Sequence, residues 1–212
     1  MIIVPAILTD DRGELERQVK ICEQFTDYAQ IDIMDGHFVH NRSVGWQDLS
    51  SIETTLSYEI HLMVTHPADE VDHFSRISGV KRIYCHFETN WQAAAEKIKA
   101  KGLEFGLALN PETEIPHLDH GLLNQIDSIM LMTVNPGAQG QNFIPHVLPK
   151  ARHAKSLHSG IIVAVDGGVR LDNIEQVVRA GVEQVCVGAA IMAADDPAAE
   201  YRKFLEASGQ LP

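Results

Sequence analysis

The chain has 212 residues, 45% of them hydrophobic, so it can bury a real core and is short of the length at which cores usually divide. Its formal net charge of -12 argues against a nucleic acid or an anionic membrane as partner. No apolar run is long enough to span a membrane, and the start, MIIVPAILTDD, lacks the features of a signal peptide. With only three scattered cysteines, we expect a cytoplasmic protein with reduced thiols.

Short apolar runs alternate with longer amphipathic stretches eight times along the chain. We interpret the apolar runs as β-strands, at 2–5, 28–33, 57–63, 81–86, 104–109, 127–134, 161–166 and 183–187. Helix signals fall between them. Asp11 and Glu14 have the spacing of a capping box, Pro67 suits a first helical turn, and Gly102 suits a helix end. The last helix is expected from about Pro197 to Ala207.

This rhythm of strand and helix is not interrupted by a linker, a low-complexity segment or a sequence repeat. Eight βα units in succession predict a single α/β domain over 1–212, folded as a (β/α)8 TIM barrel. A doubly wound open sheet is the rival fold. Against it, the first strand is followed by PAILTDD and not by a glycine-rich dinucleotide fingerprint.

Polar residues gather near the predicted strand ends, where barrels carry their functional groups. Asp32, His61 and Asp166 lie near the ends of the second, third and seventh strands, and Met34 and Met63 share faces with the first two. Together they predict a metal site, or an acid and base facing each other across a substrate. Taken singly, each also fits a structural role, as a turn cap, a packed imidazole or a core thioether.

Small residues follow three of the strands. Gly167 and Gly168 follow the seventh strand, and Gly188 with Ala189 follows the eighth, in the two loops where barrels commonly hold a phosphate. Glycine lets backbone N–H groups approach an anion closely, although it also simply makes tight turns. The run VNPGAQGQNF at 134–143 is either a mobile lid over a ligand or an ordinary surface loop.

Five strings spread over nearly the whole chain resemble the ribulose-phosphate 3-epimerase family. They are IDIMDGHF at 31–38, HLM at 61–63, LNP at 109–111, VNPG at 134–137 and VDGG at 165–168. The resemblance implies a cytoplasmic, metal-binding isomerase of carbohydrate metabolism that interconverts ribulose 5-phosphate and xylulose 5-phosphate in the pentose phosphate pathway. Its partner is then a phosphorylated ketose, with no nucleic acid and no membrane, and a homo-oligomer stays open.

The resemblance also implies roles for individual residues. Asp32 and Asp166 would remove the proton on C3 from one face and return one to the other, through an enediolate. In the family a divalent metal such as zinc, iron, manganese or cobalt holds the enediolate oxygens, and Asp32, His61 and Asp166 would bind it here. His61 would also contact the substrate. The residues matching the thioether layer are Met34, Met63 and Met132, and those matching the phosphate loops and the lid are Gly137, Ala138, Gln139, Gly140, Gly167, Gly168, Gly188 and Ala189.

The sequence departs from the family pattern at the metal site. Gln30 stands where the family has a histidine, and its amide oxygen is a weaker ligand than imidazole for zinc-like metals. Three ligands still suffice for a catalytic metal, and the oxygen-rich set favours manganese or magnesium, or an empty site. Further departures lie in substrate-binding segments. Ala6 and Ala189 replace serines, Ala138 and Gln139 replace Phe and Gly in the lid, and His40 replaces a proline.

Three hypotheses follow from these observations. The first is a sugar-phosphate 3-epimerase of the ribulose-phosphate type, with altered metal or substrate preference. The second is a degenerate paralogue that binds a sugar phosphate without epimerase activity. The third is a lyase or another isomerase among the phosphate-binding barrels. It fits less well, because Met34 stands where the D-x-K-x-x-D motif of the decarboxylases has its lysine. Pentulose and hexulose phosphates are not distinguished.

Overall fold

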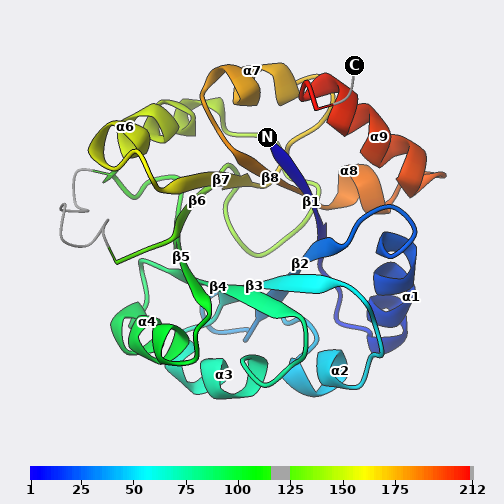
Figure 1. The fold of residues 1–212 in the computed structure, drawn as a ribbon, viewed down its shortest axis with the longest axis vertical. Helices are drawn as coiled ribbons and strands as arrows, with labels where there is room; N and C mark the ends of the chain where they lie inside the picture. The colour runs from blue at the N-terminus through cyan, green and yellow to red at the C-terminus, as the bar shows by residue number, and fades with distance from the viewer. Residues whose placement is uncertain (116–124, 211–212) are drawn as a thin grey trace.

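Eight parallel strands form a closed barrel in the computed structural model, which describes residues 1–115 and 125–210 (Figure 1). Each strand pairs with its neighbours in chain order, and β8 pairs with β1 to close the ring. The strands are β1 Ile2–Ile7, β2 Tyr28–Met34, β3 Ser57–Met63, β4 Val80–His86, β5 Glu104–Leu109, β6 Ser128–Met132, β7 Ile162–Asp166 and β8 Gln184–Val187. The predicted (β/α)8 fold is therefore confirmed, and the open sheet is excluded.

Helices lie outside the ring of strands, where Figure 1 shows them covering the barrel wall. They are α1 Arg12–Cys22, α2 Trp46–Ser50, α3 Pro67–Phe74, α4 Trp91–Ala100, α6 Pro149–Leu157, α7 Ile174–Arg179, α8 Ala189–Met192 and α9 Pro197–Ala207, with a 3-10 turn η2 at Pro145–Val147. Within the described ranges, no helix is long and apolar enough to cross a membrane. All three cysteines are free and buried, as the sequence predicts.

The helix signals in the sequence have clear structural causes, with one correction. The Asp11 carboxylate accepts a 2.7 Å hydrogen bond from the Glu14 backbone N–H, which begins α1. The predicted capping box is only half formed, because the Glu14 carboxylate binds Arg17 and Gln18 within the helix instead of returning to Asp11. Pro67 occupies the first turn of α3, and α9 has the predicted bounds.

Two separate apolar layers result from the alternation of side chains along each strand. The larger layer lies between strands and helices and includes Ile83 and Cys85 of β4. Inside the barrel, Tyr84 of the same strand packs with Met130 and Cys186. A Cβ on Gly106 of β5 would lie 2.2 Å from the Tyr84 ring. Only glycine therefore leaves room for this ring in the barrel interior.

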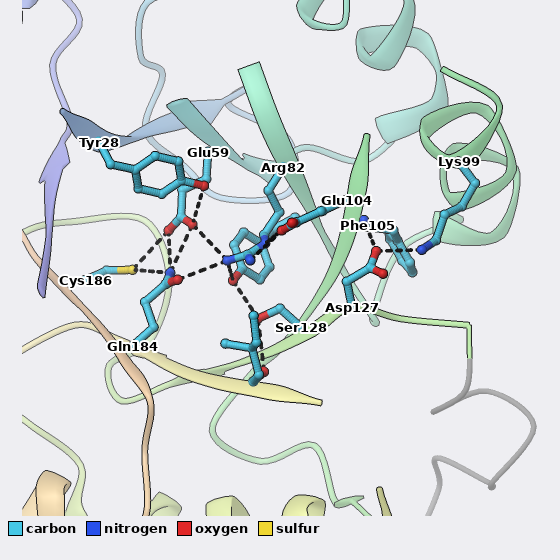
Figure 2. A network of polar contacts seen from close by, with 12 residues as sticks. Tyr28, Glu59, Arg82, Lys99, Glu104, Phe105, Asp127, Ser128, Gln184 and Cys186 are labelled. Carbon is cyan, nitrogen blue, oxygen red and sulfur yellow. Dashed lines mark hydrogen bonds and ion pairs between the residues drawn. The ribbon is translucent and has the colours of Figure 1, made fainter. Parts of the chain in front are cut away.

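The N-terminal end of the barrel interior is closed by a buried polar network (Figure 2). Arg82 of β4 contacts Glu59 of β3 at 3.3 Å and Glu104 of β5 at 2.5 Å. The Gln184 amide of β8 accepts from Arg82 at 3.0 Å and donates to Glu59 at 2.8 Å. Glu59 is fully buried, so these partners compensate a charge that burial would otherwise penalise. We call this set the barrel floor, and its residues were not singled out by the sequence.

Candidate functional site

A cavity of about 520 Å³ opens at the C-terminal ends of the strands. Its inner wall includes Asp32 of β2, His61 of β3 and Asp166 of β7, and its outer wall is made by the loops that follow β6, β7 and β8. Parallel strands bring their carboxyl ends to one rim of a barrel, so residues distant in sequence meet here. The structure therefore brings together the three side chains that the sequence placed at strand ends.

Two buried carboxylates converge on one imidazole in this cavity. His61 Nδ1 lies 3.0 Å from Asp32 Oδ1 and 3.3 Å from Asp166 Oδ2. The register explains the approach, because Asp32 pairs directly with His61 in the β2–β3 ladder. His61 is fully buried, and the two aspartates are 6% and 8% exposed.

Gln30 lies two residues before Asp32 on the same face of β2, and its amide contacts both carboxylates. Gln30 Nε2 donates to Asp32 Oδ1 and to Asp166 Oδ2, each at 2.8 Å. The oxygen of the same amide, Oε1, is buried and has no hydrogen-bond partner among the described residues. The amide group therefore acts as a double donor that offsets the repulsion between two carboxylates, while one of its own polar atoms stays unsatisfied.

Burial and charge shift the protonation of these groups. Burial alone would lower the pKa of His61, but its contacts with Asp166 and Asp32 outweigh burial and raise the pKa to about 10. The pKa of Asp32 is raised by its own burial and by the charge of Asp166, against the lowering effect of His61. His61 is thus an imidazolium between two carboxylates in the absence of a cation.

His86 adjoins His61 and Glu88 adjoins His86, and sequence reasoning missed both. His86 ends β4, and its Nε2 lies 2.9 Å from His61 Nε2. His86 Nδ1 lies 3.3 Å from the Glu88 carboxylate in the following loop. Burial lowers the pKa of His86 to about 4, against the opposing effect of Glu88, so this ring is neutral at pH 7. The sequence signal that could have identified His86 is the alternation of side chains, which places it on the same face of β4 as Tyr84, at the end of the strand.

The predicted thioether layer is only partly on the cavity wall. Met63 and Met132 line the cavity, together with Val134. Met34 does not line it and packs with Met63 and Val39 in a small adjacent apolar cluster. Met34 is the last residue of β2.

The glycine-rich loops form much of the remaining cavity wall. The predicted phosphate and lid residues that line it are Gly137, Ala138, Gln139, Gly140, Gly167, Gly168, Gly188 and Ala189. Several of these positions have little room for a side chain. A Cβ on Gly168, where φ is +68°, would lie 2.7 Å from the Phe143 backbone nitrogen. A Cβ on Gly188 would lie 3.0 Å from Gln139 Nε2. Arg170, which the sequence reading did not single out, adds a positive charge to the same wall.

The donor set suits a divalent cation. One ligand atom each from Asp32, His61 and Asp166 lies within 4.8 Å of the others, and all three residues are buried. Three protein ligands are typical of a catalytic metal that keeps a position open. The unpaired Oε1 of the Gln30 amide, whose Nε2 contacts both carboxylates, is the fourth candidate ligand atom. The residues present therefore fit a metal such as manganese or zinc.

Comparisons with known proteins agree with this geometry. Residues 2–192 match the sequence profile of the ribulose-phosphate 3 epimerase family. Ribulose-phosphate 3-epimerase from Mycobacterium tuberculosis is 34% identical over 217 residues, covering 98% of this chain and 93% of the relative. The cytoplasmic isoform from Oryza sativa is 32% identical, covering 97% and 95%. Among solved structures, 3-hexulose-6-phosphate synthase from Salmonella typhimurium superposes with a TM-score of 0.73 at 18% identity, covering 99% of both chains, which shows a shared fold.

Proposed function

The chain belongs to the ribulose-phosphate 3-epimerase family, a family of isomerases, and we propose that it interconverts ribulose 5-phosphate and xylulose 5-phosphate. The observation that carries this proposal is the pair of buried carboxylates, Asp32 and Asp166, on different strands of one cavity wall. Epimerisation needs a base that removes a proton from one face of a carbon and an acid that delivers one to the other face.

The two aspartates suit this division of labour. Asp32 comes from β2 and Asp166 from β7, and both contact His61 and Gln30 through one carboxylate oxygen only. Among the described residues, the second oxygen of each carboxylate makes no hydrogen bond, so each is available for a substrate proton. We propose that one carboxylate takes the C3 proton while the other, protonated, returns a proton to the opposite face. Burial raises the pKa of Asp32, which favours its protonated form and strengthens it as a base.

Asp32, His61 and Asp166 would hold the divalent metal, and Gln30 is the fourth candidate. When bound, a divalent metal supplies Lewis acidity that stabilises negative oxygens beside the reacting carbon. Before a metal binds, His61 positions both carboxylates, because its Nδ1 contacts one oxygen of each. Met63 and Met132 exclude water from the same wall of the cavity, which strengthens the electrostatic interactions there.

We propose that the phosphate lies against the loops after β7 and β8. Gly168 and Gly188 expose their backbone there, and a side chain at either position would meet a neighbour. Arg170 supplies a positive charge in a protein whose overall charge of -12 repels an anion. The loop from Gly137 to Gly140 forms the outer wall, and we propose that it closes over the ligand.

Turnover of ribulose 5-phosphate tests the proposal directly. The purified protein is treated with a chelator and assayed after addition of manganese, zinc, iron or cobalt. We expect turnover with at least one metal, and we expect Asp32→Asn and Asp166→Asn each to abolish it. Exchange of the C3 proton with deuterated solvent is the second readout. No turnover and no exchange with any metal would reject the epimerase and leave the degenerate sugar-phosphate-binding paralogue.

Two further proposals concern the whole chain. We propose that residues 1–212 act as one domain, since strands from Ile2 to Val187 all belong to one barrel. We also propose that the protein works in the cytoplasm, by analogy with the Oryza sativa relative that is named as a cytoplasmic isoform. A single cooperative unfolding transition tests the single domain, and localisation of the tagged protein tests the compartment, while size-exclusion chromatography with light scattering measures the oligomeric state.

A further inference from the structure

A line of hydrogen bonds runs from the buried His61 to the loop after β5. His61 Nε2 faces His86 Nε2 at 2.9 Å, and His86 Nδ1 faces Glu88 Oε2 at 3.3 Å. The other oxygen of Glu88 accepts from the Asn110 backbone N–H at 2.9 Å and from the Thr113 hydroxyl. Both imidazoles are fully buried. Residues from β3, β4 and the loop after β5 are thereby joined behind the cavity wall.

The proton positions along this line follow from its chemistry. Glu88 is held by two donors on one oxygen, and its other oxygen accepts the proton on His86 Nδ1. A neutral His86 then has no proton on Nε2, so that atom accepts a hydrogen bond. The proton shared by the two facing nitrogens must consequently belong to His61 Nε2. This leaves His61 Nδ1, the nitrogen that faces Asp32 and Asp166, as the atom that binds a cation.

We propose that His86 and Glu88 are positioning residues that fix His61 with Nδ1 toward the metal and Nε2–H toward the protein interior. This inference rests on the proposed function, because it concerns the same metal site. Partners behind a ligating histidine set its tautomer and ring orientation and raise its basicity. Phe38 supports the arrangement, since its ring packs against His86 with centroids 4.7 Å apart.

The alternative is that His86 and Glu88 only fill space and satisfy each other. Two observations favour positioning. The Nε2 to Nε2 distance of 2.9 Å is a hydrogen bond and not a packing contact. Glu88 is also fixed from two further sides, by Asn110 and Thr113, so it can hold His86 in one orientation. A carboxylate that merely filled space would not need three donors.

Co²⁺ binding to the metal-free protein tests the proposal without reference to turnover. The dissociation constant is measured by competition with a chelator, and the visible spectrum of the bound Co²⁺ reports its coordination. We expect Glu88→Gln and His86→Leu each to weaken Co²⁺ binding about 10- to 100-fold. His86→Gln should retain affinity to within a few fold, because its amide oxygen still accepts from His61 Nε2–H. Glu112→Gln, an exposed change in the neighbouring loop, is the matched control.

Nitrogen-15 NMR of the histidines in the metal-free wild type gives the second readout. We expect His86 at neutral pH with its proton on Nδ1 and none on Nε2. A proton on Nε2 of a neutral His86 would overturn the proposal, as would Co²⁺ affinity in Glu88→Gln within threefold of the wild type, or a wild type that binds no Co²⁺. If epimerase activity is absent while these two readouts agree, the proposed function fails and the positioning role stands.

Discussion

Replacing Gln30 by histidine, the residue that the family has at this position, tests how the glutamine affects the affinity of this chain for a metal. In the wild type, the Gln30 amide donates to Asp32 and Asp166, each at 2.8 Å. A hydrogen bond to a charged group contributes about 1.5–3 kcal/mol. A cation that binds through the two oxygens contacted by the amide must therefore displace interactions of about 3–6 kcal/mol in total. Rotation of the amide, which would turn the unpaired Oε1 inward, recovers only part of this.

A histidine at this position donates at most one such hydrogen bond when neutral, and it offers a nitrogen ligand. On metal binding, the histidine variant therefore loses one charge-assisted hydrogen bond fewer than the wild type, which corresponds to about 1.5–3 kcal/mol. Because about 1.4 kcal/mol corresponds to a tenfold change in affinity, we expect Gln30→His to bind zinc about 10- to 100-fold more tightly. Competition with a chromogenic chelator measures this affinity directly.

Gln30→Leu separates the two contributions to the expected change. It removes the donor without supplying a ligand, so it should fall well short of the histidine variant. Equal tightening in both variants would show that loss of the donor is the whole effect. Unchanged or weaker zinc binding by Gln30→His would refute the reasoning, because it would mean that the amide does not compete with the metal.

Three further predictions concern stability and the phosphate loops. Chelator-treated protein should be most stable near pH 6.5, the ordinary pKa of histidine in an unfolded chain, as urea unfolding at several pH values will show. His61 keeps its proton on folding, so its contribution to the unfolding free energy is lost as pH rises from 6.5 toward 10. His86 gives its proton up on folding, so its contribution is lost as pH falls from 6.5 toward 4. His86→Gln should flatten only the acid side, and an unchanged acid limb would contradict this. Arg82→Met should cost about 3–5 kcal/mol of unfolding free energy, because it leaves Glu59 buried without its cation, and adding Glu59→Gln should restore more than half. A single variant as stable as the double variant would show that the pair is dispensable. Gly168→Ala should raise KM for the sugar phosphate at least tenfold with a smaller change in kcat, since its Cβ would lie 2.7 Å from the Phe143 nitrogen, and a KM within twofold would argue against this loop as the phosphate site.

The fold could be predicted from the sequence because its signals are local. Period-two alternation and the positions of glycine and proline located every strand, and the bounds at 57–63 and 104–109 agree with the structure. The sixth strand is shorter than the predicted 127–134, because the chain leaves the ladder after Met132. Thr133 then bonds to the Asp166 carbonyl through its backbone N–H at 2.8 Å, which ties the strand end to β7 without extending it.

The contacts around the site could be predicted only in part. Asp32, His61 and Asp166 stand at strand ends, so barrel geometry alone predicts that they meet. Glu88 lies in a loop, and its contacts with His86, Asn110 and Thr113 depend on how that loop packs against the next one. No periodicity encodes such a contact. The donor role of the Gln30 amide likewise depends on the distance between strands β2 and β7.

The two ends of the barrel interior treat buried charge in opposite ways. At the floor, Glu59 pairs with Arg82 and bonds to Gln184, so the carboxylate is compensated by the fold itself (Figure 2). At the mouth, Asp32 and Asp166 share a single cation, His61, and a neutral amide. That layer keeps a net negative charge, which costs stability in a buried setting.

Such an imbalance is expected where function, and not stability, determines the residues. The excess negative charge attracts a divalent cation, and it also makes the carboxylates better bases toward carbon. In this chain the amide of Gln30 donates to both carboxylates and so offsets part of the negative charge that attracts the cation. Metal affinity and carboxylate basicity should therefore change together when residue 30 is varied. A variant that binds zinc more tightly should also hold His61 more firmly protonated before the metal arrives, because its carboxylates lose a donor that competes with His61 for the same oxygens.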